Sequence, residues 1–495
     1  MGLTISVTDF EMDKDQRPTQ PGFSESLLPI FFLVFLLFTS VYLFGEESSY
    51  GPTQIALTSA AAVAALIGTR NGYSWKEIEK GIIKGITLSF SSILILLAVG
   101  ALIGTWILSG IVPAFIYWGL QLMNPSYFFV TACCISALIS FVTGSSWATV
   151  STIGIALIGI AGAMELSLSV VAGAVISGAY FGDKLSPLSD TTNLAPAMAG
   201  TDLFTHIHHM LWTTIPTISF SLIVYTVMGL GSNRAVKSQG IHEFMEVLAS
   251  SFYISWYLLI PPAVLVCLVL CKIPTLPALL LGAFLGGVFA CLFQESAVLQ
   301  FVNQPELEDT MAVLKGFWKA LFSGYVSSSG NIQIDELLTR GGMKSMLNTV
   351  WLILSAMVFG GVMEKTCMLQ VIVRKLHSRT QSTGGLILST IGTCIGMNIV
   401  ASDQYISIVF PGRMYCARFE KLGLKSKNLS RCLEDAGTLT SPLVPWNTCG
   451  VFMAQTLSVS TIAYLPFCFF NLMNPILSSI YGLTGFTIER IEGKS

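Results

Sequence analysis

The sequence predicts an all-α, polytopic membrane protein with two inverted-topology repeats, whose broken helices meet near the membrane midplane. Only 11% of the 495 residues are charged and 53% are hydrophobic, whereas a soluble domain carries about 25% charged residues. The apolar residues gather in runs such as 27–44 and 86–109, which are long enough to cross a bilayer. Polar breaks recur at matching places in the two halves, and this recurrence predicts the repeats.

Composition also limits the function. The net charge of −2 favours neither nucleic acid nor anionic lipid as a partner. The chain contains no CxxC, HExxH, GxSxG or Walker-type motif, so the sequence offers no catalytic signature and an enzyme is not expected.

Apolar segments bounded by charges, Gly and Pro divide the chain into about fourteen stretches. The first half holds 27–44, 53–69, 86–109, 126–143, 147–163, 168–200 and 208–230, and the second half holds 255–271, 275–293, 346–365, 384–402, 404–418, 433–459 and 461–483. We therefore predict a polar cytoplasmic tail (1–26), a first transmembrane repeat (27–230), an inter-repeat loop (231–254), a second transmembrane repeat (255–485) and a C-terminal tail (486–495).

The repeats are predicted from two pairs of polar breaks. The stretch 186–193, which begins Ser-Pro-Leu, matches 441–448, which begins in the same way. A second break, Gly144-Ser145-Ser146-Trp147, matches Ala401-Ser402-Asp403-Gln404 at nearly the same offset. Two matched breaks with similar spacing in each half favour an internal duplication.

Charge distribution indicates that the repeats are inverted. The turn at 161–168 has no Lys or Arg, whereas its counterpart carries Arg413, Arg418, Lys421, Lys425, Lys427 and Arg431. Short basic loops stay in the cytoplasm, so equivalent loops lie on opposite sides and both termini are predicted to be cytoplasmic. Many secondary transporters have this architecture. The segment pairs within 126–163 and 384–418 are compatible with two full spans or with a hairpin.

The polar breaks carry the candidate binding residues. Prolines in the breaks remove backbone donors and free carbonyl groups, and hydroxyl, amide and carboxylate oxygens suit a hard cation rather than a soft transition metal. The predicted cation- or substrate-binding residues are Asp190, Asp183, Thr191, Thr192, Asn193, Ser145, Ser146, Asp403, Ser441, Asn447 and Thr448. Asp190 and Asp183 are the predicted direct Na⁺ ligands.

A carboxylate at this depth is expected to bind either Na⁺ or a proton, because desolvation raises its pKa and a bound cation lowers it. Asp190 is the first candidate for this role, Asp183 the second and Asp403 the third. The alternatives are that Asp183 pairs with Lys184, and that Asp403 only caps the helix that follows it.

Other charged residues are interpreted as structural. Glu434 and Asp435 open the broken segment 433–459 and suit a helix N-terminus. His206, His208 and His209 lie near the end of a span and are interpreted as solvated residues at the membrane interface.

At these motifs the chain resembles the NhaC family of sodium/proton antiporters, within the broader ion transporter superfamily. The resemblance covers about residues 27 to 485 and is carried by Gly182-Asp183-Lys184-Leu185-Ser186-Pro187-Leu188-Ser189-Asp190-Thr191-Thr192-Asn193, Ala401-Ser402-Asp403-Gln404-Tyr405, Pro411-Gly412-Arg413-Met414 and Ser441-Pro442-Leu443-Val444-Pro445-Trp446-Asn447-Thr448-Cys449-Gly450. It implies exchange of Na⁺ for H⁺ across a bacterial plasma (inner) membrane. Some relatives instead couple ions to malate or lactate.

The sequence therefore leaves three functions open. The leading one is a Na⁺/H⁺ antiporter working by alternating access. The second is a Na⁺- or H⁺-coupled malate/lactate exchanger, in which Lys184 and the polar breaks bind the organic acid. A passive ion channel is less expected, because channels favour pore-lining rings over paired broken helices. The expected partners are Na⁺, H⁺, malate or lactate, and the lipid bilayer, without nucleic acid; a homodimer is compatible with the sequence. No cofactor is expected beyond the transported Na⁺ and H⁺.

Overall fold

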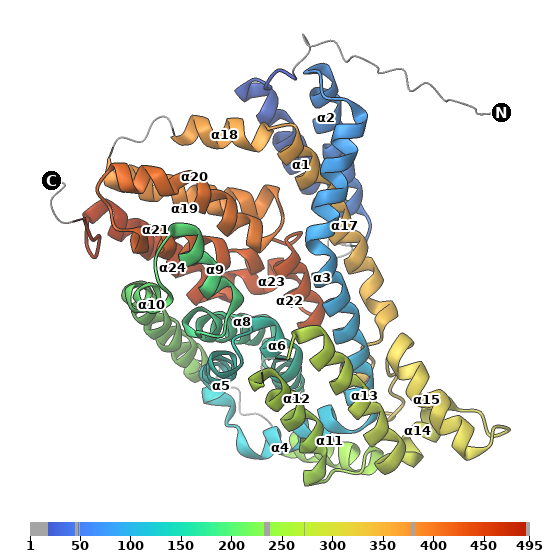
Figure 1. Ribbon diagram of the computed structural model, residues 1–495. Coiled ribbons are helices and arrows are strands. Elements are labelled where there is room, and N and C mark those ends of the chain that lie inside the picture. Colours follow the sequence, from blue (N-terminus) through green and yellow to red (C-terminus); the bar gives the residue numbers. More distant parts are fainter. Residues whose placement is uncertain are drawn as a thin grey trace, which may run out of the picture.

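The computed structural model describes residues 18–44, 48, 50–231, 238–271, 273–377 and 382–491. These residues are almost entirely helical (Figure 1). Within the described ranges the only β pairing consists of two isolated bridges, Tyr325 with Arg340 and Leu424 with Arg490. Most of the predicted tail 1–26 lies outside the described residues, although its last residues already belong to the first helix.

The first predicted repeat contains ten α-helices and a π-helical turn. They are α1 (Phe23–Phe44), α2 (Pro52–Arg70), α3 (Trp75–Leu108), α4 (Ile111–Leu122), α5 (Phe128–Thr143), α6 (Ser146–Thr149), η3 (Val150–Gly154), α7 (Ile155–Ala163), α8 (Leu168–Leu185), α9 (Asp190–Ala199) and α10 (Leu203–Gly231). A short 3-10 turn, η2 (Pro125–Tyr127), precedes α5.

The second half is more interrupted. After α11 (Ser238–Ser251), which lies in the predicted inter-repeat loop, come η4 (Trp256–Leu259), α12 (Ile260–Leu270), α13 (Thr275–Phe293), α14 (Glu295–Val302), α15 (Asp309–Ser323), α16 (Ile332–Leu338), η5 (Met343–Met346), α17 (Leu347–Lys365), α18 (Met368–His377), α19 (Thr383–Val400) and α20 (Gln404–Lys421). The broken segment comprises α21 (Ser426–Cys432), the π-helical η6 (Leu433–Thr438), η7 (Ser441–Leu443) and α22 (Thr448–Leu457). The chain closes with α23 (Thr461–Tyr464), η8 (Leu465–Phe467) and α24 (Phe469–Thr484).

The protein is a multi-pass membrane protein. Among the described residues, nine helices are long and apolar enough to cross a bilayer, or up to eleven if each sharply bent pair is one span. The remaining apolar segments of the sequence form shorter, more polar or interrupted helices. One bent pair joins α22 to α23 and η8 at an angle of 89°.

The helices form two groups, and each group takes elements from both halves of the chain. In the first group α3 packs against α13 and α17, and α2 packs against α17. In the second group α5 packs against α8, and α24 packs against α10 and α19. Figure 1 shows α2, α3 and α17 running along one side, with α8, α9, α10 and α19 to α24 gathered on the other.

The packing within the first group is what a two-fold relation would produce. In the predicted repeats, α13 corresponds to α2 and α17 corresponds to α3. The contacts follow this correspondence: α2 packs against α17, and its counterpart α13 packs against α3, the counterpart of α17. The inverted relation of the repeats and the domain boundaries remain predictions.

Two glycines fix the place of the first polar break. A Cβ atom on Gly178 would lie 2.1 Å from the carbonyl oxygen of Cys133, and one on Gly182 would lie 2.3 Å from that of Ala137. These small residues let the backbones of α8 and α5 touch, as small residues do between membrane helices. This close packing of α8 on α5 places Asp183, at the end of α8, beside the start of α6, where it contacts Ser146.

Candidate functional site

A cavity of about 880 Å³ lies where polar breaks of the two halves face each other. Its first-half lining includes Thr143, Gly144, Ser145, Ser146, Trp147, Asp183, Pro187, Leu188, Ser189, Asp190, Thr191 and Asn193, and its second-half lining includes Gln404, Tyr405, Thr448 and Cys449. Residues of α3, α12 and α13 close the remaining wall. Trp147 stacks on Phe452 with 4.0 Å between ring centroids, which joins α6 to α22 beside the cavity.

Asp183 is the buried carboxylate of this cavity, with only 6% of its surface exposed. Its Oδ2 accepts hydrogen bonds from the backbone N of Ser146 at 3.1 Å and from the Ser146 hydroxyl at 2.6 Å. Charge-assisted hydrogen bonds of this kind are the strong ones. The structure therefore joins the two first-half breaks through one carboxylate.

Lys184 does not pair with Asp183. Neighbouring residues on a helix point to different faces, and Lys184 Nζ lies 2.5 Å from Oδ1 of Asp435 and 3.0 Å from Oδ1 of Asn474. All three side chains are fully buried. The alternative of an Asp183–Lys184 ion pair is wrong for this structure, and Lys184 instead links the first half to the second.

Asp190 has a different environment from the one expected of a coupling carboxylate. It begins α9 and lines the cavity, but its side chain is exposed. A solvated carboxylate attracts cations, yet it lacks the desolvation on which competition between Na⁺ and H⁺ depends. In this structure the second candidate, Asp183, is buried, whereas the first candidate, Asp190, lies on the water-exposed lining of the cavity.

The other first-half residues divide into two sets. Thr191 is buried, lines the cavity and donates to Oε1 of Glu434 at 3.1 Å. Thr192 instead donates to the carbonyl oxygens of Asp183 and Lys184, both at 3.1 Å. Asn193 donates to the carbonyl oxygens of Pro187 and Ser189. Thr192 and Asn193 therefore satisfy backbone groups that the broken helix leaves open, and so hold the shape of the break.

The second-half residues mostly stabilise their own helices. Asn447 caps α22 by accepting from the backbone N of Cys449, and its amide donates to Asn398. Ser441 donates to the carbonyl oxygen of Thr438 and to Gln404 Oε1. Neither Asn447 nor Ser441 lines the cavity, whereas Thr448 does.

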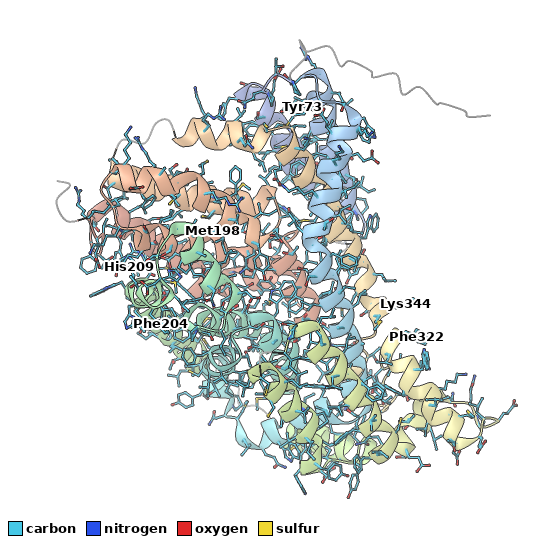
Figure 2. All side chains as sticks on the ribbon, viewed as in Figure 1. Tyr73, Met198, Phe204, His209, Phe322 and Lys344 are labelled. Carbon is cyan, nitrogen blue, oxygen red and sulfur yellow. The ribbon has the colours of Figure 1, made fainter. Side chains whose placement is uncertain are left out.

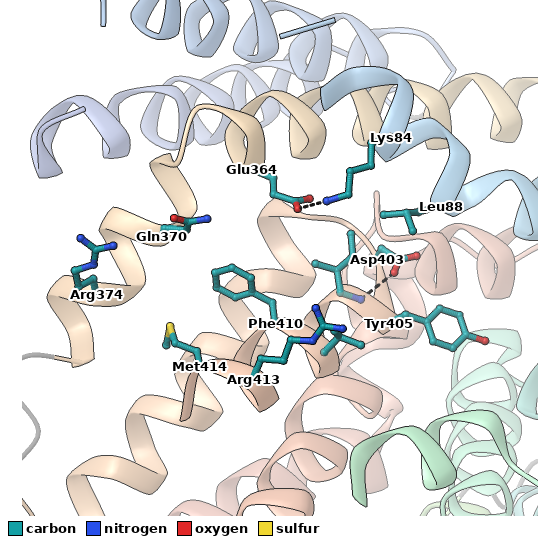
Figure 3. Close-up of a pocket in the computed structure, with 12 residues that line it drawn as sticks. Lys84, Leu88, Glu364, Gln370, Arg374, Asp403, Tyr405, Phe410, Arg413 and Met414 are labelled. Carbon is teal, nitrogen blue, oxygen red and sulfur yellow. Dashed lines mark hydrogen bonds and ion pairs between the residues drawn. The ribbon is translucent and has the colours of Figure 1, made fainter. Parts of the chain in front are cut away.

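Asp403 lies apart from the other candidate carboxylates. It is 3% exposed and caps α20 by accepting from the backbone N of Ile406 at 3.1 Å, which is the capping role considered above. It lines a second cavity of about 790 Å³ (Figure 3) with Lys84, Glu364 and Arg413. Lys84 and Glu364 form an ion pair there at 2.7 Å. Tyr405 and Leu88 line both cavities and so lie between them.

Sequence reasoning missed the buried charges of the second break. Glu434 and Asp435 do not begin a solvated helix; they lie in the π-helical η6, and both are fully buried, as is Arg431 one turn earlier. Single-turn π segments often occur at functional sites. The available signal was the close spacing of these charges within the stretch 431–435, at the opening of a broken segment.

The interpretation of the histidines is partly wrong. His206 and His209 are buried, at 0% and 3% exposure, and only His208 is exposed. Figure 2 labels His209 and Phe204 on α10. His206 Nδ1 lies 2.8 Å from the hydroxyl of Ser430, so α10 packs this histidine against α21 instead of presenting it to solvent.

The buried charges are unbalanced. Among the described residues, the buried carboxylates are Asp183, Asp403, Glu434 and Asp435, whereas the buried cationic side chains are Lys184 and Arg431. Uncompensated charge is costly in a dry interior, so this region favours a bound cation or proton. No group of three or more His, Cys, Asp or Glu side chains in the described residues is arranged to hold a metal ion, and Na⁺ ligands would include hydroxyl and carbonyl oxygens.

Helices broken around a carboxylate-lined cavity inside a multi-pass bundle define a secondary transporter. The chain belongs to the Na⁺/H⁺ antiporter family, whose model matches residues 178–486. This confirms the family resemblance seen in the sequence motifs.

Similar proteins of known name are antiporters with different cargoes. The Na⁺/H⁺ antiporter NhaC of Alkalihalophilus pseudofirmus is 36% identical over 96% of this chain and 98% of its own length. The malate-2H⁺/Na⁺-lactate antiporter of Bacillus subtilis is 36% identical over 88% of this chain and 90% of its own. The arginine/ornithine antiporter ArcD of Halobacterium salinarum is 32% identical over 97% of this chain and 95% of its own.

Proposed function

We propose that this protein exchanges Na⁺ for H⁺ by alternating access, with Asp183 as the cavity carboxylate that binds Na⁺. The observation that carries this proposal is the burial of Asp183 in a cavity that it shares with the oxygen atoms of Ser145, Ser146 and Thr448. Hard oxygen ligands around a carboxylate suit a hard monovalent cation. Asp190, on the exposed part of the same lining, attracts the cation electrostatically before it reaches Asp183.

Exchange follows if the loaded states cross the membrane and the empty charged state does not. The buried carboxylates of this region outnumber its buried cationic side chains, and this excess of negative charge is strongly disfavoured in a low-dielectric interior when neither a cation nor a proton is bound. Either ion relieves this cost. The conformational change between inward- and outward-open states therefore occurs with Na⁺ or with H⁺ bound, which couples the two fluxes.

We further propose that the protein lies in a bacterial plasma membrane with both termini in the cytoplasm. The C-terminal segment lies beside the basic loop 413–431, because Lys425 N donates to the carbonyl oxygen of Glu489 at 3.0 Å. Near the N-terminus, Gln20 Oε1 accepts from Arg374 at 3.1 Å. Both ends thus lie near basic segments that the positive-inside rule assigns to the cytoplasm. A homodimer remains a prediction from the sequence.

The test uses purified protein in liposomes that contain a pH-sensitive dye. An imposed Na⁺ gradient is expected to move protons in the opposite direction in the wild type, and Asp183→Asn is expected to abolish this flux per folded protein. Proton movement is then measured in the same way after pulses of Li⁺, K⁺, malate and lactate. Proton movement only with malate or lactate would replace the proposal with organic-acid exchange, and ion flux without coupling would replace it with a channel.

Organic-acid exchange has less support in the site itself. Its lining includes two carboxylates, and none of the described lining residues is Lys or Arg. Lys184, which the sequence suggested as a ligand for an organic acid, is engaged by Asp435 and Asn474. A dicarboxylate in this cavity would face repulsion from Asp183 and Asp190 without a compensating cation.

A further inference from the structure

Glu434 is a buried carboxylate that the sodium-binding cavity does not explain. It is fully buried in η6, and its Oε1 accepts the hydrogen bond from Thr191 at 3.1 Å. Its Oε2 makes no hydrogen bond of standard geometry within the described part of the chain, and the Thr438 hydroxyl on the same π-helical turn faces the carboxylate. A buried carboxylate oxygen without a partner is costly when ionised, whereas protonation turns it into a neutral acid.

The neighbouring charges are directed to Asp435 and not to Glu434. Lys184 Nζ lies 2.5 Å from Asp435 Oδ1, the Thr213 hydroxyl donates to the same oxygen, and Arg431 Nε lies 4.0 Å from Oδ2. Within the described residues, no ion pair of 4.0 Å or less reaches Glu434. The buried cationic side chains Lys184 and Arg431 thus gather at Asp435, and Glu434 beside it has no ion-pair partner of its own.

The other elements around η6 present neutral groups. From α19 and α20, Asn398 and Ser407 donate to the carbonyl oxygen of Gly437. From α24, Asn471 donates to the carbonyl oxygen of Leu439. The charged groups near Glu434 are thus Asp183 and Lys184 from α8, with Arg431 and Asp435 from its own segment.

Two hydroxyl groups connect Glu434 to the cavity. Thr191 and Ser189 line the cavity, whereas Glu434 does not. Thr191 donates to Glu434 at 3.1 Å, and its Oγ1 lies 3.2 Å from Ser189 Oγ, a contact in which either hydroxyl can be the donor. The two hydroxyls therefore form a continuous relay between the cavity and the Glu434 carboxylate, with Thr191 next to the carboxylate.

We propose that Glu434 is the proton-binding site of the exchange, distinct from the Na⁺-binding carboxylate Asp183. A hydronium ion in the cavity gives a proton to the Thr191 hydroxyl oxygen and leaves as water, while the proton of that hydroxyl moves to Glu434 Oε1. The product is a neutral acid, and the reverse transfer returns the proton to the cavity. Na⁺ beside Asp183 repels a proton on Glu434, and Na⁺ release attracts one, so the two ions oppose each other through the field across Thr191.

This inference rests on the proposed Na⁺/H⁺ exchange, and one experiment separates the two. Na⁺ binding to purified protein in detergent is measured by calorimetry, and proton release is measured with a pH dye in weakly buffered solution. The wild type is expected to bind Na⁺ and release protons. Glu434→Gln is expected to bind Na⁺ without proton release, whereas Asp183→Asn is expected to lose Na⁺ binding. Thr191→Val is expected to slow proton release by about 100- to 10,000-fold, the scale of a lost proton-transfer group.

Matched variants distinguish the relay from a folding defect. Thr191→Ser keeps a hydroxyl and should restore the wild-type rate. Ser407→Ala removes a buried hydroxyl that contacts the same segment outside the relay and should release protons as the wild type does. Wild-type proton release from a folded Glu434→Gln protein would overturn the inference and leave the exchange intact. If Glu434→Gln does not fold, Thr191→Val with an unchanged rate overturns it instead. Absence of Na⁺ binding by the wild type would overturn the proposed function.

Discussion

The two large polar breaks, 182–193 and 431–448, look alike in sequence but face different surroundings. The first directs Asp183 and Asp190 into the cavity. In the second break, Glu434 and Asp435 do not line the cavity and are completely buried. A matching motif therefore does not mean a matching environment: the first break presents its carboxylates to the cavity, and the second buries two carboxylates, of which Asp435 pairs with Lys184 of the first break.

The largest expected effect comes from removing the link between the breaks. Lys184→Met leaves Asp435 buried with only Arg431 nearby, and breaking a buried ion pair from one side costs about 3–5 kcal/mol. We expect a large loss of thermal stability in detergent. Lys184→Met combined with Asp435→Leu removes both charges and should recover most of that loss. A double variant as unstable as the single one would show that the pair does not act as a unit.

The next largest effect is expected at the close contact between α8 and α5 that positions Asp183. Gly182→Ala puts a methyl group within 2.3 Å of the Ala137 carbonyl oxygen, and overpacking of this kind typically costs about 1–3 kcal/mol. We expect weaker Na⁺ binding along with lower stability, because α8 must move away from α5 and from Ser146. Gly200→Ala is the control, since nothing lies within 4 Å of a Cβ at Gly200; its positive φ of 76° adds only local strain. Equal Na⁺ affinity in wild type and Gly182→Ala would contradict this account.

The first break contains two carboxylates, Asp183 and Asp190, and substituting Asp190 compares their roles. Because its side chain is exposed, we expect Asp190→Asn to raise the Na⁺ concentration for half-maximal transport about tenfold, equivalent to about 1.4 kcal/mol, without abolishing exchange. Transport per folded protein at several Na⁺ concentrations measures this. Complete loss of exchange would return Asp190 to the role of coupling carboxylate for which the sequence makes it the first candidate.

The smallest effect on function is expected when single cysteines are introduced into two loops and labelled. Single cysteines in the turn 161–168 and in the loop 413–431, on a cysteine-depleted background, should react differently with an impermeant maleimide in intact cells. Only the turn is expected to be labelled from outside, because the basic loop is predicted to be cytoplasmic. Labelling of both positions, or of neither, would argue against inverted repeats.

The sequence was sufficient to predict the helical membrane fold, the family and the positions of the breaks, because these depend on apolar length and on local residue types. It could not assign the environment of each side chain. Asp183 and Lys184 are adjacent, yet only tertiary contacts send one to the cavity and the other to Asp435. The burial of Glu434 and His206, and the exposure of Asp190, likewise depend on which helices pack around them.

Helix α3 is much longer than a membrane is thick. Its 34 residues extend about 51 Å at 1.5 Å per residue. The hydrocarbon core of a bilayer is about 30 Å thick. Even a tilt of about 40°, the upper end of the usual range, leaves the helix longer than the core. The exposed Lys76 and Lys80 occupy its first turns and would anchor it among lipid headgroups. Sliding α3 along the membrane normal would drag these ammonium groups into hydrocarbon. We therefore predict that the wall of α2, α3, α13 and α17 is the stationary frame of the proposed alternating access, and that the other group of helices moves against it.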